Sequence, residues 1–359
     1  LPGRAASKTS SAPKLLFYLL FRMRAIVVNR PGGYAQLRIV EKTLPDLAPD
    51  EVRVAVSYVG VNYADCLVRM GLYSAAKKSF PIVPGFDFAG VVSKIGSRVS
   101  ELKLGDRVLG VTRFGAYKTE VQVGQAYVLK IPDTLDLAVA ASLPTVYLTA
   151  SHLLHKLAHL SAGERLLVRS VGGGVGSWLY QLGIMSGAEV HGTVSTAEKK
   201  KILTSRGISN VSVGEPEGRF DVIVNAQGGV SIKRDLARLK PRGRLLLYGF
   251  HGFVHTNDSG CLSALSYVRL ALGLLRMPRI HPFTLVSENK AVLGCNLVYL
   301  FDKVEENRAS LQKLFDLIKE DKVDVPPITE IPFEDVAKAQ QLLEHGKTVG
   351  KLVLKVTQS

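Results

Sequence analysis

A glycine-rich segment carries the clearest chemical signal in this chain of 359 residues. Its residues are Gly172, Gly173, Gly174, Val175 and Gly176. Glycine lets a backbone come close to a ligand, because no Cβ stands in the way and a positive φ is allowed. The segment lies between an apolar, strand-like run (166–168) and an apolar, helix-like run (178–185), and Ser177 takes the place of a third Gly or Ala. This context predicts a helix N-terminus that binds a pyrophosphate, with a purely structural turn as the alternative.

The residues after the next predicted strand (189–194) indicate which nucleotide is bound. An NAD site usually places a carboxylate about 20 residues beyond the glycines, where it binds the ribose hydroxyls. Here hydroxyl side chains are followed by three lysines, Lys199 to Lys201. Hydroxyls and a lysine can bind a 2′-phosphate that a carboxylate would repel. The pattern therefore favours NADPH as the cofactor, and a solvated, lysine-rich helix start is the alternative.

Composition and charge narrow the class of protein. Hydrophobic residues make up 47% of the chain and charged residues 21%, as in ordinary globular enzymes. The three scattered cysteines argue against a disulfide framework and for a reducing compartment, which we expect to be the cytoplasm. The net charge of +15 suits a cofactor with several phosphates. Basic runs interleaved with aromatics are missing, so nucleic acid is not expected as a partner, and RNA binding is kept only as a weak third alternative.

Residues 1–22 form a basic N-terminal extension without acidic residues, and they end in an apolar stretch over 15–21. Two interpretations stay open: part of a mitochondrial targeting segment, or an extension with no structural role. The apolar stretch is too short to cross a bilayer, and no transmembrane helix is predicted.

Two kinds of pattern divide the rest of the chain. Short alternating strands separated by turns predict a β-rich, barrel-like module up to about Pro144. A helix over 146–160 then leads to strands and helices that alternate as in a doubly wound parallel sheet, an α/β fold. The C-terminal helices (307–319 and 333–345) and a closing strand (350–354) return to the first module.

Residues 262–275 are apolar with Arg269 as their one charged residue, and they predict a helix. We interpret this helix as a cover over a cleft or as an oligomer contact. A helix lying on a membrane surface is the alternative.

Several short motifs follow one another in a specific order. They are Val61-Asn-Tyr-Ala-Asp65, Arg69-Met-Gly-Leu-Tyr73, Pro84-Gly-Phe-Asp-Phe-Ala-Gly-Val-Val92, Gly105-Asp-Arg-Val108, Gly173-Gly-Val-Gly176 and Gly192-Thr-Val-Ser-Thr-Ala-Glu-Lys199. Together, over residues 23–357, the chain resembles the medium-chain dehydrogenase/reductase superfamily and, within it, the zinc-independent quinone oxidoreductases. Segment 288–297 is most similar to the branch of the synaptic-vesicle amine-transport-like proteins.

The resemblance implies a domain organisation. A GroES-like barrel domain, which is the catalytic domain, would comprise residues 23–146 and 287–359. A Rossmann domain that binds NADP would comprise residues 147–286, and residues 1–22 would be the extension.

The resemblance also bears on metal. Zinc enzymes of this superfamily have a Cys and a His-Glu pair where this chain has Asn62 and Phe86-Asp87. Amide and phenyl groups cannot supply the thiolate and imidazole that catalytic zinc requires, so no metal is expected. His152, His155 and His159 have helical spacing but no nearby carboxylate. Surface or packing roles are expected for them.

The implied site residues surround a cleft between the domains. By resemblance, Asn62 faces the nicotinamide and the substrate, with Tyr63, Asp65 and Tyr73 around it. Each has a structural alternative: a satisfied loop amide for Asn62, a helix N-cap for Asp65 and a packed aromatic for Tyr73. Resemblance likewise places Thr149 at the start of the cofactor lobe, and Ser195 and Lys199 at the 2′-phosphate.

Certain positions depart from the family pattern. Arg169 and Ser170 stand in a run that usually has small residues, and Asn225 replaces an Asp. The connection 210–220 is short and is predicted to lack a helix.

These observations predict an NADPH-dependent, zinc-independent reductase of quinones or α,β-unsaturated carbonyls (enones), working as a homodimer. The alternative is an NADP-binding protein of low turnover that acts through membrane or protein partners, including peripheral association with a membrane.

Overall fold

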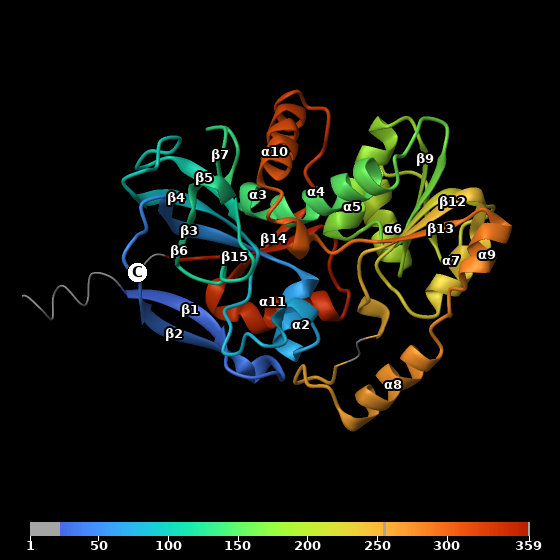
Figure 1. The fold of residues 1–359 in the computed structure, drawn as a ribbon, viewed down its shortest axis with the longest axis horizontal. Coiled ribbons are helices and arrows are strands. Elements are labelled where there is room, and N and C mark those ends of the chain that lie inside the picture. The colour runs from blue at the N-terminus through green and yellow to red at the C-terminus, as the bar shows by residue number, and fades with distance from the viewer. Residues whose placement is uncertain (1–21, 254–255, 358–359) are drawn as a thin grey trace, which may run out of the picture.

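The computed structural model describes residues 22–253 and 256–357, so the predicted extension lies outside the described residues apart from Arg22. Within these ranges the chain forms a parallel sheet on one side and a largely antiparallel sheet on the other, with helices around and between them (Figure 1). The predicted fold class, a Rossmann-like layer joined to a β-rich domain, is confirmed.

The described part of the parallel sheet has six strands, and their order reverses between β8 and β11. The side chains of Leu166, Leu167 and Val168 on the central strand β8 are 0% exposed, as expected for a strand covered on both faces. In sheet order the strands are β10 (Val211–Val213), β9 (Glu189–Val194), β8 (Arg165–Val168), β11 (Phe220–Asn225), β12 (Leu239–Leu247) and β13 (Ala291–Gly294). The helices between them are α5 (Gly174–Met185), α6 (Ala197–Thr204) and α7 (Ser231–Arg238).

Two sequence-based expectations about this sheet have different outcomes. Residues 214–219, between β10 and β11, contain no helix, which confirms the short connection. The parallel sheet does not end at residue 286, however, because β13 pairs with β12. The expected domain boundary therefore cuts through this layer, because residues 291–294, which were expected in the catalytic domain, belong to the parallel sheet.

The second sheet is organised around β3 (Glu51–Val61), which pairs with β4, β6 and β15. Strand β15 comes from the end of the chain and aligns Leu352 with Val61, so the C-terminal part returns to the first module as predicted. The other strands are β4 (Asp87–Ile95), β5 (Arg107–Val111), β6 (Glu120–Gly124), β7 (Val128–Lys130), β14 (Ile328–Pro332) and β15 (Lys351–Lys355). A separate hairpin pairs β1 (Arg22–Val28) with β2 (Leu37–Thr43).

Helices fill the space around the two sheets. Tyr147 on α4 packs edge-on against Trp178 on α5, with ring centroids 5.3 Å apart. Helix α4 continues as a π-helical turn over His152–Leu157. The remaining helices are α2 (Tyr63–Met70), α3 (Leu137–Ser142), α4 (Pro144–Ser151), α8 (Ala264–Leu275), α9 (Pro282–Glu288), α10 (Val304–Lys319) and α11 (Val336–Glu344). Among the described residues no helix is long and apolar enough to cross a membrane.

Candidate active site

A cavity of about 840 Å³ is lined by residues that follow β8, β9 and β11 and by the adjoining ends of β3 and β15. In open α/β sheets, ligands bind outside the carboxyl ends of the strands where the strand order reverses. That point lies between β8 and β11 in this protein. The cavity is therefore the candidate site, and both sheets contribute to it.

The glycine turn forms one wall, and all five of its predicted residues line the cavity. Gly173 is the N-cap of α5, and as a glycine it has no side chain that could cap the first turn. The backbone N–H groups of that turn are therefore available to bind an anion. A Cβ on Gly174 would lie 2.9 Å from Val146 Cγ1, and one on Gly176 would lie 2.3 Å from the Ser170 carbonyl oxygen. Glycine is thus required at both positions, and a diphosphate fits this cradle.

Ser195 and Lys199 also line the cavity, beyond the end of β9. The side chain of Thr196 accepts a hydrogen bond from the Lys199 backbone N–H (3.2 Å) and so fixes this residue in the first turn of α6. The Lys199 ammonium donates to the carbonyl of Gly346 in the C-terminal part of the chain, and burial lowers its pKa. A 2′-phosphate would offer it a stronger, charged acceptor.

Asn62 lies at the end of β3, with 7% of its surface exposed. Its Nδ2 donates to Asp87 Oδ2 (2.8 Å), and its Oδ1 accepts from the Lys351 ammonium. A lysine can only donate and a carboxylate can only accept, so these partners fix which amide atom is oxygen. Among the described residues the second amide N–H has no acceptor, which leaves it for a ligand in the cavity.

Asp87 is completely buried beside Asn62 and is held from several directions. It accepts hydrogen bonds from the backbone N–H of Thr145 (3.0 Å) and from the Thr145 hydroxyl. The strand opposite makes room for it, because a Cβ on Gly60 would lie 2.9 Å from Asp87 Oδ2. The Asp87 carboxylate is therefore held in place beside the Asn62 amide, and it orients that amide.

Asp65 has the contacts of a structural residue. It is completely buried and accepts hydrogen bonds from the backbone N–H groups of Asn62 (2.8 Å) and Gly85 (3.0 Å) and from the Tyr117 hydroxyl (3.1 Å). With Asn62 it forms the capping box that begins α2. Burial raises its pKa to about 7, yet it is not a lining residue of the cavity.

The structure places the other three predicted residues differently. Tyr63 lines the cavity, edge-on to the ring of His251 at 5.9 Å, and burial raises its pKa. Tyr73 and Thr149 are not lining residues. The Tyr73 hydroxyl donates to Asn296 Oδ1 (2.8 Å), and that of Thr149 donates to the carbonyl of Thr145 within α4 (2.6 Å).

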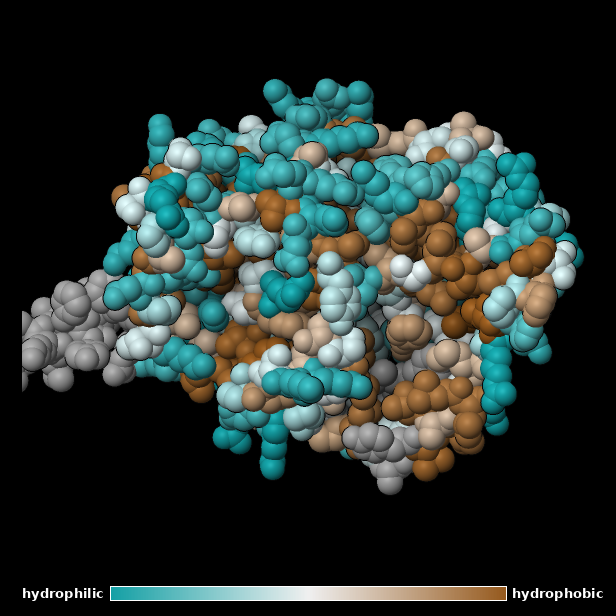
Figure 2. Space-filling model, in the orientation of Figure 1, coloured by the Kyte–Doolittle hydropathy of each residue, from teal (hydrophilic) through white to brown (hydrophobic). Residues whose placement is uncertain are grey.

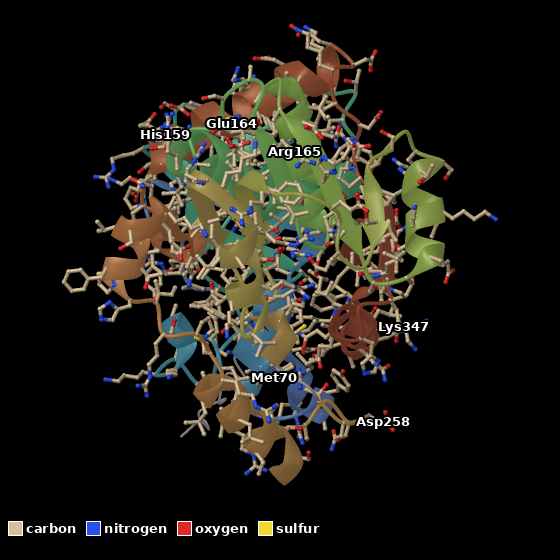
Figure 3. The ribbon with its side chains drawn as sticks, turned by 90° about the vertical axis from the view of Figure 1, so that its right-hand side faces the viewer. Met70, His159, Glu164, Arg165, Asp258 and Lys347 are labelled. Carbon is tan, nitrogen blue, oxygen red and sulfur yellow. The ribbon has the colours of Figure 1, made fainter. Side chains whose placement is uncertain are left out.

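The positions that hold zinc in relatives are packed by other groups. Phe86 is 2% exposed and lies in an aromatic cluster with Tyr73, Phe114 and Phe301. Among the described residues no three His, Cys, Asp or Glu side chains are arranged to hold a metal ion. In Figure 3, His159, the last of the three spaced histidines, lies at the upper end near Glu164 and Arg165. Lys347 follows the cavity-lining Gly346 in sequence and lies in the lower half of the same view, away from His159.

Sequence reasoning missed several lining residues. Lys351 reaches Asn62 from a position 289 residues away, so no local pattern could reveal it. Tyr248 and His251 follow β12, and the rule that parallel strands present ligands at their carboxyl ends could have found them. Burial lowers the pKa of His251.

Three of the residues that line the cavity, Arg169, Glu215 and Arg234, belong to one charged cluster. Arg169 is 2% exposed; its guanidinium donates to Glu215 (2.8 and 3.0 Å) and to Asp235. Asn225 donates to the other oxygen of Asp235 (2.5 Å). Arg234 also pairs with Glu215 (2.9 Å), and both line the cavity. The carboxylate that the short connection brings to the nucleotide site is thus neutralised by arginines.

Known proteins are similar to this chain in sequence and in architecture. Residues 48–133 match the family described as alcohol dehydrogenase GroES-like domain, and residues 202–354 match the family described as zinc-binding dehydrogenase. The human synaptic vesicle membrane protein VAT-1 homolog-like is 31% identical over 349 residues, which cover 93% of this chain and 81% of that protein.

Solved structures of related proteins have the same fold as this chain. The crystal structure of the human VAT-1 homolog-like protein matches with a TM-score of 0.77 at 25% identity and covers 94% of this chain and 99% of that one. Escherichia coli quinone oxidoreductase complexed with NADPH matches with a TM-score of 0.79 at 26% identity, over 93% and 99%. The two sheets and the cavity between them define a medium-chain dehydrogenase/reductase. Within that superfamily, this chain belongs to the quinone oxidoreductase-like family near the VAT-1 homologues, which confirms the resemblance.

Proposed function

We propose that this protein is an NADPH-dependent, zinc-independent reductase of quinones or α,β-unsaturated carbonyls. One observation carries the proposal: a single cavity joins the glycine turn, Lys199 and the amide of Asn62. The E. coli quinone oxidoreductase, which was solved with NADPH, supports the choice of cofactor.

The ends of the cavity would bind the two ends of the cofactor. The open N-terminus of α5 would hold the diphosphate, and Ser195 and Lys199 would hold the 2′-phosphate. Asn62 and Tyr63 line the same cavity and would face the nicotinamide and the substrate. Bound NADPH supplies a hydride from the C4 atom of its nicotinamide.

The side chains near Asn62 suit an acceptor whose charge can delocalise. Without zinc, the oxygen that gains negative charge must be stabilised by hydrogen bonds. The second amide N–H of Asn62 is a donor available for this oxygen, and Lys351 and Asp87 hold the amide in place. Isolated ketones need stronger polarisation, whereas quinones and enones spread the charge by conjugation.

Absorbance of NADPH tests the proposal directly. Purified protein is mixed with a panel of quinones and enones, with NADH in parallel, and metal content is measured on the same sample. We expect oxidation of NADPH, little oxidation of NADH and no stoichiometric zinc. Lys199→Glu is expected to weaken NADPH binding by about a hundredfold, because it replaces attraction to the 2′-phosphate by repulsion. Lys200→Glu, exposed one residue away on α6, is the matched control.

Each negative result has a defined meaning. NADPH binding without turnover of any acceptor would reject the enzyme and leave the low-turnover binding protein. Equal use of NADH, or unchanged NADPH affinity in Lys199→Glu, would reject the assignment of the 2′-phosphate.

A second candidate function rests on exposed apolar residues of two helices that follow one another in sequence, which we group under the name α8–α9 surface. Its members, each more than 40% exposed, are Val268, Leu272, Leu274, Leu275, Phe283 and Val286. Hydrophobic residues gather over α8 in Figure 2, and the exposed Arg276 and Arg279 lie beside them in sequence. An apolar face with basic neighbours suits an anionic membrane surface. The relative named a synaptic vesicle membrane protein supports this candidate.

A homodimer remains a proposal. Strand β13 ends the parallel sheet, so one of its edges lacks a strand partner among the described residues. Such an edge can pair with a second copy of the chain.

A further inference from the structure

Lys351 occupies an unusual place for a lysine. It is the first residue of β15 and is only 5% exposed, and the three residues after it, Leu352 to Leu354, are buried and apolar. The register that pairs Leu352 with Val61 brings Lys351 beside Asn62. On its other side, the backbone N–H of Gly350 donates to the carbonyl of Gly172 (2.8 Å). Lys351 thus lies where the catalytic sheet meets the glycine turn.

The cost of burying this ammonium indicates a role beyond packing. A buried ion pair loses much of its Coulombic gain to desolvation, and an apolar side chain of similar size is often as stable or better. The Asp87 carboxylate lies 3.5 Å from the Lys351 nitrogen, so the pair is not tight. The closer contact, at 2.5 Å, is to the Asn62 side-chain oxygen. Burial lowers the pKa of Lys351, and the carboxylates of Asp87 and Asp65 oppose this shift. In its protonated form the side chain mainly holds and polarises one neutral amide.

We propose that Lys351 is the positioning residue of the reduction: it holds the Asn62 amide with one N–H toward the substrate oxygen and places a positive charge behind it. The inference rests on the proposed function, which it deepens. Hydride adds to the conjugated carbon, the π electrons move to the carbonyl oxygen, and NADPH becomes NADP⁺. Water then protonates the resulting enolate, and a quinone reduced in this way reaches the hydroquinone when the keto form loses the extra ring proton by tautomerisation. The Lys351–Asn62 pair stabilises that anion where a zinc enzyme would use its metal.

The substrate class follows from this arrangement. The pair offers one neutral N–H donor backed by a cation, so it favours acceptors that become anionic at a single oxygen during hydride transfer. Enones and quinones do so.

Two measurements on the full chain test the role of Lys351. The first is steady-state turnover of Lys351→Met and Lys351→Arg, with Lys355→Met as the matched control, since Lys355 lies on the same strand but is 59% exposed. We expect Lys351→Met to lower kcat by about a hundredfold, as for loss of an oxyanion donor, with the KM for NADPH unchanged. Lys351→Arg is expected to recover most of the activity, because the charge and the donor are kept.

The second measurement needs no turnover. 4-Nitrophenol, whose phenolate imitates the enolate, is titrated into the protein with NADP⁺, and its visible absorbance reports the ionised fraction. We expect the wild type and Lys351→Arg to bind the phenolate, and Lys351→Met and Asn62→Ala to shift the bound probe toward the neutral phenol.

The outcomes distinguish failure of the proposed function from failure of the role assigned to Lys351. A wild type without turnover rejects the proposed function, while the probe still decides on Lys351. Turnover and probe ionisation unchanged in Lys351→Met would overturn the positioning role. If Lys351→Met does not fold, Lys351→Gln replaces it, because an amide keeps a donor but no charge. Probe ionisation in Lys351→Gln equal to that of the wild type would likewise overturn the role.

Discussion

At the scale of one residue, Asp65 is a buried carboxyl group that stabilises the fold next to the candidate active site. Burial raises its pKa from 3.8 to about 7 in the folded state, while three hydrogen bonds hold it in the capping box of α2. Between about pH 4 and pH 7 the folded protein therefore keeps a proton that the unfolded chain has released. Stability contributed by this group falls as the pH rises through that window.

The prediction concerns Asp65→Asn, which cannot titrate. The free energy of unfolding of the wild type minus that of the variant is expected to decrease as the pH rises from about 4 to about 7. Urea unfolding at several pH values measures it. Asp106→Asn is the control, since hydrogen bonding to Lys130 lowers the pKa of Asp106 and moves its effect below this window. A difference that stays constant with pH for Asp65→Asn would contradict the raised pKa.

Residues with a local signal could be predicted, and residues with distant partners could not. The glycine turn and Asn62 follow from neighbours in sequence, and the structure places them in one cavity. Lys351 has no such signal, because its partner is 289 residues away. Arg169 and Asn225 were noticed only as departures from the family. The structure shows that both bind Asp235, so these departures form one network with the Glu215 of the short connection.

At the scale of elements, a buried ion pair joins helices from opposite ends of the chain. Arg69 on α2 and Glu344 on α11 are 0% and 3% exposed and lie 2.5 Å apart. Glu344 also accepts hydrogen bonds from Tyr34 (3.0 Å) and Thr256 (2.9 Å). Arg69 donates to the carbonyl of Gly260 (2.8 Å). The pair therefore holds α2, α11 and the segment before α8 together.

Glu344→Gln is expected to lower the free energy of unfolding by about 3 kcal/mol, because it leaves the buried Arg69 charge without a counter-charge. Glu334→Gln is the matched control. Its carboxylate pairs with Arg24 but is 45% exposed, so the loss should stay below about 1 kcal/mol. Chemical unfolding of the two variants compares them. Equal losses would show that burial does not strengthen the dependence on Glu344.

The elements themselves were predicted where their patterns are strong. The alternating residues of β3 and the apolar runs of β8, β9 and β11 gave strands in the right places. Strand β14 was missed because it is short, mostly exposed and ends in proline, so it lacks a clear alternation. Strand β13 has only four residues, and its place in the parallel sheet depends on β12 rather than on its own sequence.

At the scale of the whole molecule, net charge and exposed apolar area act together. The chain carries a formal charge of +15, and both helices of the α8–α9 surface lie at the outside of the molecule, α8 below the sheets and α9 at the edge of the parallel sheet in Figure 1. Apolar insertion gives little selectivity among lipids, whereas attraction of basic residues to anionic headgroups does and is screened by salt. A second copy of the chain is the competing occupant of this surface.

Sedimentation with liposomes separates these occupants. We expect the wild type to cosediment with vesicles of phosphatidylcholine and phosphatidylserine, and much less with phosphatidylcholine alone or at high salt. Leu275→Glu combined with Phe283→Glu should abolish cosedimentation, because it places charges at positions 81% and 76% exposed, while NADPH oxidation stays unchanged. Val230→Glu, at a 63% exposed position at the start of α7, is the control. A wild type that stays in solution with all vesicles, but whose dimer dissociates in the double variant by light scattering, would assign this surface to self-association instead.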